Sequence, residues 1–142
     1  MNTFSYLITA AALLSASAVF AADKTVTNKL YTEKGEAGQQ VITEQSDGSL
    51  SAELNVGWNN RVVKIKEKLS LTDKGLPVLF EASGTSAFGA PIAEKFSLED
   101  GVGRWSGNKD EGMLQSGEPR FYVPADEAGA SSYALMKALL AS

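Results

Sequence analysis

The clearest pattern in the chain is the alternation of hydrophobic and polar residues between Arg61 and Trp105. Residues 63–72 place Val, Ile and Leu side chains on one face of an extended segment and mostly Lys, Ser and Thr on the other. Similar runs follow at residues 76–82 and 92–98, and a further run carries Trp105. Short turns that contain glycine, D-K-G at 73–75 and E-D-G at 99–101, separate the runs. This region therefore predicts antiparallel strands with one buried face.

The segment before this region predicts three more strands. Residues 25–32 are rich in Thr, Val, Leu and Tyr, and a loop is expected at the two glycines of residues 35–38. A weak strand follows at residues 39–45, and Asp47-Gly48 is a strong hairpin signal before the alternating run that ends at Trp58. No crossover helix separates any of these runs, so we expect a mainly β, antiparallel up-and-down meander of about seven strands. Periodicity leaves open whether the sheet is only curled or forms an open barrel.

The C-terminal part has a different pattern. Residues 106–120 have the composition of a loop, which we expect to be mobile. A short C-terminal helix is predicted over residues 131–141, with Ser131 or Ser132 as its N-cap. We expect Leu135, Leu139 and Leu140 to dock this helix onto the apolar face of the sheet, because so short a helix is unstable alone in water.

The N-terminal residues are interpreted as a targeting signal. Residues 7–19 form an uncharged apolar run that is short for a bilayer of about 30 Å, and polar sequence follows it. Small residues at Val19 and Ala21 suit a cleavage site, so we predict a signal peptide over residues 1–21 and a single β-rich domain over residues 22–142. Residues 1–6 contain no Lys or Arg, which departs from the usual signal. The prediction is a periplasmic or secreted protein without stable membrane insertion after cleavage.

Composition excludes several classes of function. The chain has 142 residues, with 13 basic against 17 acidic side chains, so it lacks the positive surplus that nucleic-acid binding requires. It has no Cys, which excludes disulfides, thiol nucleophiles and Cys-ligated metals. It has no His, which removes the usual general base and the usual imidazole ligand. We therefore predict no catalytic residues, no metal site and no cofactor on this chain.

Two acidic residues interrupt the apolar face of the predicted sheet. Glu67 lies between Ile65 and Leu69, and Glu94 lies in the same way between two apolar positions. One hypothesis is a ligand site in which Arg104 bridges the two carboxylates. The alternative, which we favour, is that the acids reach water at a rim or form a structural ion pair.

Two tryptophans and a row of lysines allow similar alternatives. Trp58 and Trp105 are candidates for stacking on a ligand, although in a small domain such residues are more often core anchors. The stripe formed by Lys64, Lys66 and Lys68 is interpreted as a solvated strand face rather than an anion site.

The sequence also resembles a known family. The pattern E-x-L-x-L-x-x-x-G-L-P, then S-G-T-x-x-F-G, then E-x-F and Trp105 is similar to the N-terminal β-rich region of secreted bacterial proteins of the amidohydrolase superfamily. The resemblance covers roughly Asn55 to Leu140. In that family the β-rich region precedes a metal-dependent catalytic barrel, whose His-x-His pair, further His residues and Asp have no counterpart here.

The resemblance implies an exported, non-enzymatic β-domain, either a truncated product or a stand-alone relative of the accessory region. Its partner would then be a catalytic amidohydrolase domain. The alternative function is a periplasmic binding module whose curled sheet holds a small amphipathic ligand, with Glu67, Glu94 and Arg104 orienting the polar end. No nucleic acid is expected as a partner in either case.

Overall fold

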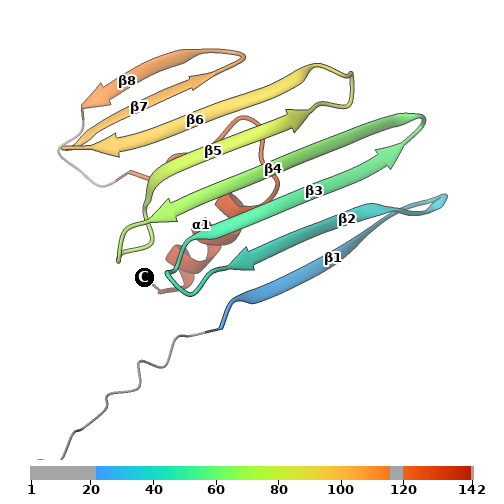
Figure 1. The fold of residues 1–142 in the computed structure, drawn as a ribbon, viewed down its shortest axis with the longest axis horizontal. Coiled ribbons are helices and arrows are strands. Elements are labelled where there is room, and N and C mark those ends of the chain that lie inside the picture. Colours follow the sequence, from blue (N-terminus) through green and yellow to red (C-terminus); the bar gives the residue numbers. More distant parts are fainter. Residues whose placement is uncertain (1–21, 116–119, 142) are drawn as a thin grey trace, which may run out of the picture.

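The fold is one antiparallel β-sheet with a helix on one of its faces (Figure 1). A computed structural model describes residues 22–115 and 120–141. Its strands are β1 Lys24–Thr32, β2 Gly35–Glu44, β3 Leu50–Trp58, β4 Arg61–Leu71, β5 Pro77–Thr85, β6 Pro91–Glu99, β7 Val102–Gly107 and β8 Glu111–Gln115, and its helix is α1 Ala130–Ala141. The predicted signal peptide, residues 1–21, lies outside the described residues.

All eight strands pair with their neighbours in sequence, in the order β1-β2-β3-β4-β5-β6-β7-β8. This order follows from the turns, since each strand is joined to the next by a short connection that only an antiparallel neighbour allows. Asn59 and Asn60, with φ of 50° and 62°, and Asp100 and Gly101, with φ of 51° and 75°, adopt the left-handed conformations that two-residue hairpins require. The predicted up-and-down meander is confirmed, and the sheet is curled but not closed, with β1 and β8 at its two edges.

Two local predictions were wrong. The loop expected at residues 35–38 is part of β2, and the chain turns earlier, at Glu33 and Lys34. Residues 106–120, expected as a loop, contain β8, which pairs with β7 through five residues. Strand β8 includes Gly112, one of the glycines that gave the segment its loop-like composition, and this glycine packs beneath the ring of Trp105.

The two faces of the sheet differ as the alternation predicted. One face carries the core, which the sheet shares with residues of the C-terminal segment: Ile42, Leu50, Ala52, Ile65, Leu69, Phe80, Ala82, Ile92, Phe96, Ala128, Ala130 and Ala134. The other face is polar, and the three predicted lysines on β4 are exposed there. One of them, Lys66, lies 3.2 Å from Glu53 of β3. We call the two surfaces the covered face and the outer face.

The covered face is closed by residues 120–141, which we call the covering segment. Helix α1 packs against β3 and β4, and Figure 1 shows it crossing behind the sheet. The helix docks as expected but by different residues. Ala130, Ser131 and Ala134 are buried against the sheet, whereas Leu139 and Leu140 are 65% and 86% exposed and Leu135 is only half-buried. Small residues face the sheet because they let the helix approach closely, so the predicted leucine docking is wrong.

Candidate functional site

The candidate site is a row of residues that crosses the covered face from strand to strand. The strand register aligns Ala52 of β3, Glu67 of β4, Ala82 of β5, Glu94 of β6 and Gly107 of β7. Residues opposite each other in antiparallel strands project from the same face, so both acids lie on the covered face, as the sequence predicted. Every neighbour of an acid in this row is alanine or glycine. The row therefore alternates a small residue with a carboxylate from strand to strand.

Glu67 is buried, with only 2% of its surface exposed, and it binds the start of α1. Its Oε2 accepts hydrogen bonds from the backbone N–H groups of Ala128, Gly129 and Ala130, at 2.8, 2.9 and 3.1 Å. Its Oε1 accepts the N–H of Ser131 at 3.0 Å. The first N–H groups of a helix have no acceptor within the helix, and the helix dipole favours a negative charge at this end. Glu67 thus caps α1 from another strand of the fold.

This contact replaces the local cap that the sequence suggested. Neither Ser131 nor Ser132 is the N-cap, because α1 begins at Ala130 and Gly129 precedes it with a φ of 115°. The Ser132 hydroxyl instead donates to Glu127 Oε1 at 2.6 Å, and the Ser132 N–H donates to Glu127 Oε2 at 3.2 Å. A sequence pattern could not identify Glu67 as the cap, since sixty-odd residues separate it from the helix.

Glu94 is 7% exposed and holds the same segment two strands away. Its Oε1 accepts the Tyr122 hydroxyl at 2.5 Å and the Ala125 N–H at 3.1 Å. Its Oε2 accepts the N–H groups of Ala125 and Asp126 at 3.2 and 3.3 Å. The two carboxylates therefore anchor the covering segment at two points, one before the helix and one at its first turn.

Tyr122 joins the Glu94 anchor to the hydrophobic core. Its ring stacks on Phe96, with 4.2 Å between ring centroids and 8° between planes, and it lies 5.8 Å from the Phe80 ring. Burial raises the pKa of Tyr122 well above its usual value, and the hydrogen bond to the Glu94 carboxylate raises it further. The hydroxyl therefore stays protonated and donates to Glu94. Tyr122 was not predicted from the sequence as a partner of the acids.

Arg104 does not bridge the two carboxylates, so that part of the site hypothesis is wrong. Arg104 pairs with Ser97 of β6 and Met113 of β8, and its neighbour Trp105 pairs with the core residue Phe96. Side chains alternate between faces along a strand, so Arg104 projects from the outer face, where it is exposed. The sequence hypothesis assigned Arg104 to the wrong face of the sheet, because Arg104 is next to Trp105, which faces the core, and adjacent residues of a strand point to opposite faces.

The two tryptophans lie apart. Trp105 is half-buried and packs against the core, and its ring covers Gly112 so closely that a Cβ there would lie 2.4 Å from Cζ2. This contact supports the core-anchor interpretation of Trp105. Trp58 ends β3 beside the turn to β4 and remains 40% exposed, so it is not a core anchor. Trp105 lies on the covered face beside the row of acids, two residues from Gly107, the partner of Glu94, whereas Trp58 lies at the far end of β3.

The chemistry of the site follows from the donors that face it. Both carboxylates accept several hydrogen bonds from the protein itself, which is how buried charges are satisfied. Within residues 22–115 and 120–141, no three His, Cys, Asp or Glu residues are grouped so that they could hold a metal ion. No helix in that described part is long and apolar enough to cross a membrane. Because both carboxylates accept N–H groups of the covering segment, the arrangement is suited to fixing that segment on the sheet.

A separate groove lies at the end of α1, away from the two acids. It has a volume of about 650 Å3 and lies between the β2–β3 turn, the β4–β5 turn and the last turns of the helix. Leu71, Ala134 and Ala138 give it an apolar floor, and charged residues surround it. Lys137 donates to Glu44 at 2.7 Å at this groove, and that hydrogen bond lowers the pKa of Glu44 and raises the pKa of Lys137.

Comparison with known proteins adds no relative from which a role could be transferred. Scans against protein-family models, curated proteins and solved structures returned no match to this chain.

Proposed function

We propose that this chain is an exported, non-enzymatic β-domain that acts as an accessory module to a catalytic domain, as its resemblance to the N-terminal region of secreted amidohydrolases implies. The observation that supports the non-enzymatic part is that both buried acids already accept hydrogen bonds from the protein itself. Glu67 accepts four backbone N–H groups and Glu94 accepts the Tyr122 hydroxyl and two backbone N–H groups.

A general base must reach the proton that it abstracts, and a metal ligand must keep a free lone pair directed at the metal. Glu67 and Glu94 are the two acids that the alternation placed on the apolar face, and their oxygens accept hydrogen bonds from the covering segment. With no His and no Cys in the chain, neither acid has an imidazole or thiol to cooperate with. This supports a structural role for the site.

The exposed surface of α1 supports the accessory part of the proposal. Met136 and Leu139 are 63% and 65% exposed, and Met136 borders a cleft between the helix and strands β1 and β2. A domain that works beside another protein can present apolar side chains in this way. The covering segment would then act as a spacer between the sheet and the catalytic domain.

The test is an activity assay on the purified chain, with panels of amide and ester substrates and with Zn2+ added or chelated. We expect turnover no greater than that of the Glu67→Gln, Glu94→Gln double variant, in which both acids lose their charge. Zinc-dependent hydrolysis that the double variant lacks would overturn the non-enzymatic role. The accessory role is tested at the gene: the DNA that follows the Ser142 codon is expected to encode a barrel containing His-x-His, in frame or shifted.

A second candidate function is a binding module for a small amphipathic ligand, and the groove at the end of α1 favours it. Its volume lies within the range of small-molecule sites, about 300–1,000 Å3, and an apolar floor with charged surroundings suits a ligand with one polar end. The groove replaces the pocket around Glu67 and Glu94 that the sequence suggested. Native mass spectrometry of protein from a periplasmic extract tests it: a bound ligand that Ala138→Trp removes supports this function, and ligand-free protein rejects it.

A further inference from the structure

Exposed aromatic side chains gather at one end of the sheet. Among the described residues, the exposed aromatic side chains are Tyr31, Trp58 and Phe88, at 66%, 40% and 80%. Tyr31 lies just before the β1–β2 turn, Trp58 ends β3 at the β3–β4 turn, and Phe88 lies in the β5–β6 turn. Figure 1 shows all three turns at the right-hand end of the sheet. The turns at the other end carry no aromatic residue, so the two ends present different surfaces.

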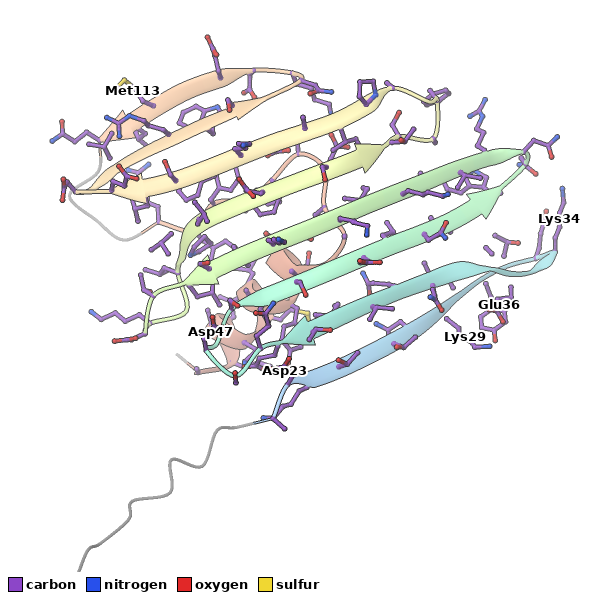
Figure 2. The ribbon with its side chains drawn as sticks, viewed as in Figure 1. Asp23, Lys29, Lys34, Glu36, Asp47 and Met113 are labelled. Atoms are coloured by element: carbon purple, nitrogen blue, oxygen red, sulfur yellow. The ribbon has the colours of Figure 1, made fainter. Side chains whose placement is uncertain are left out.

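Two contacts join the tips of these hairpins. Lys34 Nζ donates to Asn59 Oδ1 at 3.1 Å, which links the β1–β2 turn to the β3–β4 turn. Figure 2 shows Lys34 at the tip of its hairpin. The Arg61 guanidinium lies 4.5 Å from the centre of the Phe88 ring, which links the β3–β4 turn to the β5–β6 turn. The three tips therefore form one continuous surface.

The β3–β4 and β5–β6 tips also reach the same height. Lys64 of β4 pairs with Thr85 of β5. Arg61, three residues before Lys64, and Phe88, three residues after Thr85, lie equally far beyond this pair. Trp58 pairs with Arg61, so it lies at this height as well. Tips at one height can meet a flat surface together.

The β5–β6 turn holds Phe88 in a fixed position. The Ser86 N–H donates to the Ala90 carbonyl at 2.8 Å, and the Gly89 N–H donates to the Ser86 carbonyl at 2.9 Å. Gly89, with a φ of 78°, supplies the left-handed conformation that closes the turn. No charged residue occurs within residues 82–93. Phe88 can therefore enter an apolar environment without ordering a loop or burying a charge.

We propose that the tips of the β3–β4 and β5–β6 hairpins dock this domain on the surface of a phospholipid bilayer that contains anionic lipids. Phe88 enters the outer part of the hydrocarbon, and Trp58 lies at the level of the headgroups, where Trp is enriched in membrane proteins. Arg61 contacts lipid phosphates. Binding of this kind increases with the apolar area buried and with attraction to anionic lipids, and it is peripheral and reversible.

The charges of these two tips complement anionic headgroups. Residues 54–66 contain three basic residues and no acid, and residues 82–93 contain no charge. Among the described residues, Arg61 and Lys64 form no salt bridge with an acid. A basic side chain close to an anionic bilayer is attracted to it, so both cations favour this partner.

Acids lie at the neighbouring turns on either side. Glu33 and Glu36 belong to the β1–β2 hairpin, where Glu36 pairs with Lys29 at 3.0 Å, and Asp110 and Glu111 lie at the β7–β8 turn. They confine the contact to the β3–β4 and β5–β6 tips, whose own charges are all positive. The net charge of −4 matters less there, because exposed charges more than about 8 Å away are largely screened at physiological salt.

The test is co-sedimentation of the purified chain with vesicles, after its N-terminus has been determined. Vesicles of phosphatidylcholine alone are compared with vesicles that also contain phosphatidylglycerol. We expect binding to the second kind, weakened about tenfold or more by Phe88→Ala, which removes the apolar side chain that enters the bilayer. Arg61→Gln should weaken it about fivefold, the effect of one basic side chain at an anionic surface. Circular dichroism checks that each variant is folded.

Leu140→Ala is the matched control, because it removes an apolar side chain that is 86% exposed on α1, outside the hairpin tips. It should bind vesicles as the unmodified protein does. Absence of binding to both kinds of vesicle overturns the proposal and leaves the tips to a protein partner. Binding that Phe88→Ala leaves unchanged, or that Leu140→Ala weakens as much, also overturns it, because another surface then meets the lipid. Equal binding to the two kinds of vesicle overturns the preference for anionic lipid.

Discussion

Replacing Glu67 by glutamine tests the role of the buried acids directly. Glu67→Gln keeps the size and shape of the side chain but exchanges one acceptor oxygen for an NH2 group. If the remaining oxygen faces Ala128, Gly129 and Ala130, the NH2 group faces the Ser131 N–H, which loses its acceptor. The opposite orientation leaves three N–H groups unpaired. At least one buried donor is therefore unsatisfied in either case.

The expected loss of stability follows from this minimum of one unsatisfied buried donor. An unsatisfied buried donor costs about 1–3 kcal/mol, and loss of a negative charge at a helix N-terminus costs about 0.3–2 kcal/mol. Removal of a buried charge also relieves desolvation, but four N–H donors already offset that term in the native protein. We expect Glu67→Gln to lower the free energy of unfolding by about 2–4 kcal/mol, a large share of the 5–15 kcal/mol typical of a domain.

The assay is urea unfolding followed by circular dichroism and tryptophan fluorescence. Glu53→Gln is the matched control: it makes the same chemical change on the outer face, where Glu53 forms an exposed pair with Lys66 at 3.2 Å. Such a pair contributes about 0–1 kcal/mol, so the control should unfold almost as the original protein does. An unfolding midpoint for Glu67→Gln equal to or above that of Glu53→Gln would refute the reasoning.

Three further predictions follow from single contacts. Because burial and Glu94 raise the pKa of Tyr122, the stabilising contribution of this residue is complete below the unfolded-state pKa of about 10 and is lost as the pH rises above it. Between pH 9 and 11 the melting temperature of Tyr122→Phe should therefore fall less than that of the unmodified protein. Equal falls in the two proteins would contradict this. Because Lys137 holds the pKa of Glu44 below its usual value, their ion pair stabilises the fold above about pH 4.5, and this stabilisation is lost as the pH falls through the folded-state pKa. Lys137→Met should therefore have a slightly lower melting temperature than the unmodified protein at pH 7 but the same melting temperature at pH 3. A difference that persists at pH 3 would count against the pair. Gly112→Val would place a Cβ 2.4 Å from Trp105, so the ring must move; we expect red-shifted emission and a loss of about 1–3 kcal/mol, and unchanged emission would show that Trp105 does not cover Gly112.

The fold was predictable because its information is local. Alternation along β3 to β6 set which side chains share a face, and turn glycines such as Gly48, Gly75 and Gly101, with φ of 82°, 77° and 75°, fixed where the chain reverses. With every strand joined to the next by a short turn, the order of the sheet followed. Strand β8 was not predicted, because the glycines and polar residues of 106–120 have the composition of a loop, although one of these glycines, Gly112, makes room for the ring of Trp105.

The site was only half predictable, for a physical reason. Period-two alternation placed Glu67 and Glu94 correctly on the apolar face. What they bind depends on where residues 121–131 cross the sheet, and no local pattern encodes that crossing. The signal that could have helped was the alanine and glycine content of the segment, since Ala128, Gly129 and Ala130 let the backbone approach Glu67 closely. Apolar residues in α1 were expected to dock because leucine buries more area, but the close approach required alanine.

The most direct measurement of the central claim is hydrogen exchange of the backbone N–H groups of residues 128–131, followed by NMR. These groups lie before and within the first turn of α1, where N–H groups lack acceptors inside the helix and ordinarily exchange fast. If Glu67 fixes the covering segment on the sheet, they should be protected to a degree comparable with the core of β4 and β5, and Glu67→Gln should remove that protection before the strands lose theirs. Exchange of these four N–H groups at the rate of an unstructured peptide in the unmodified protein would contradict the account.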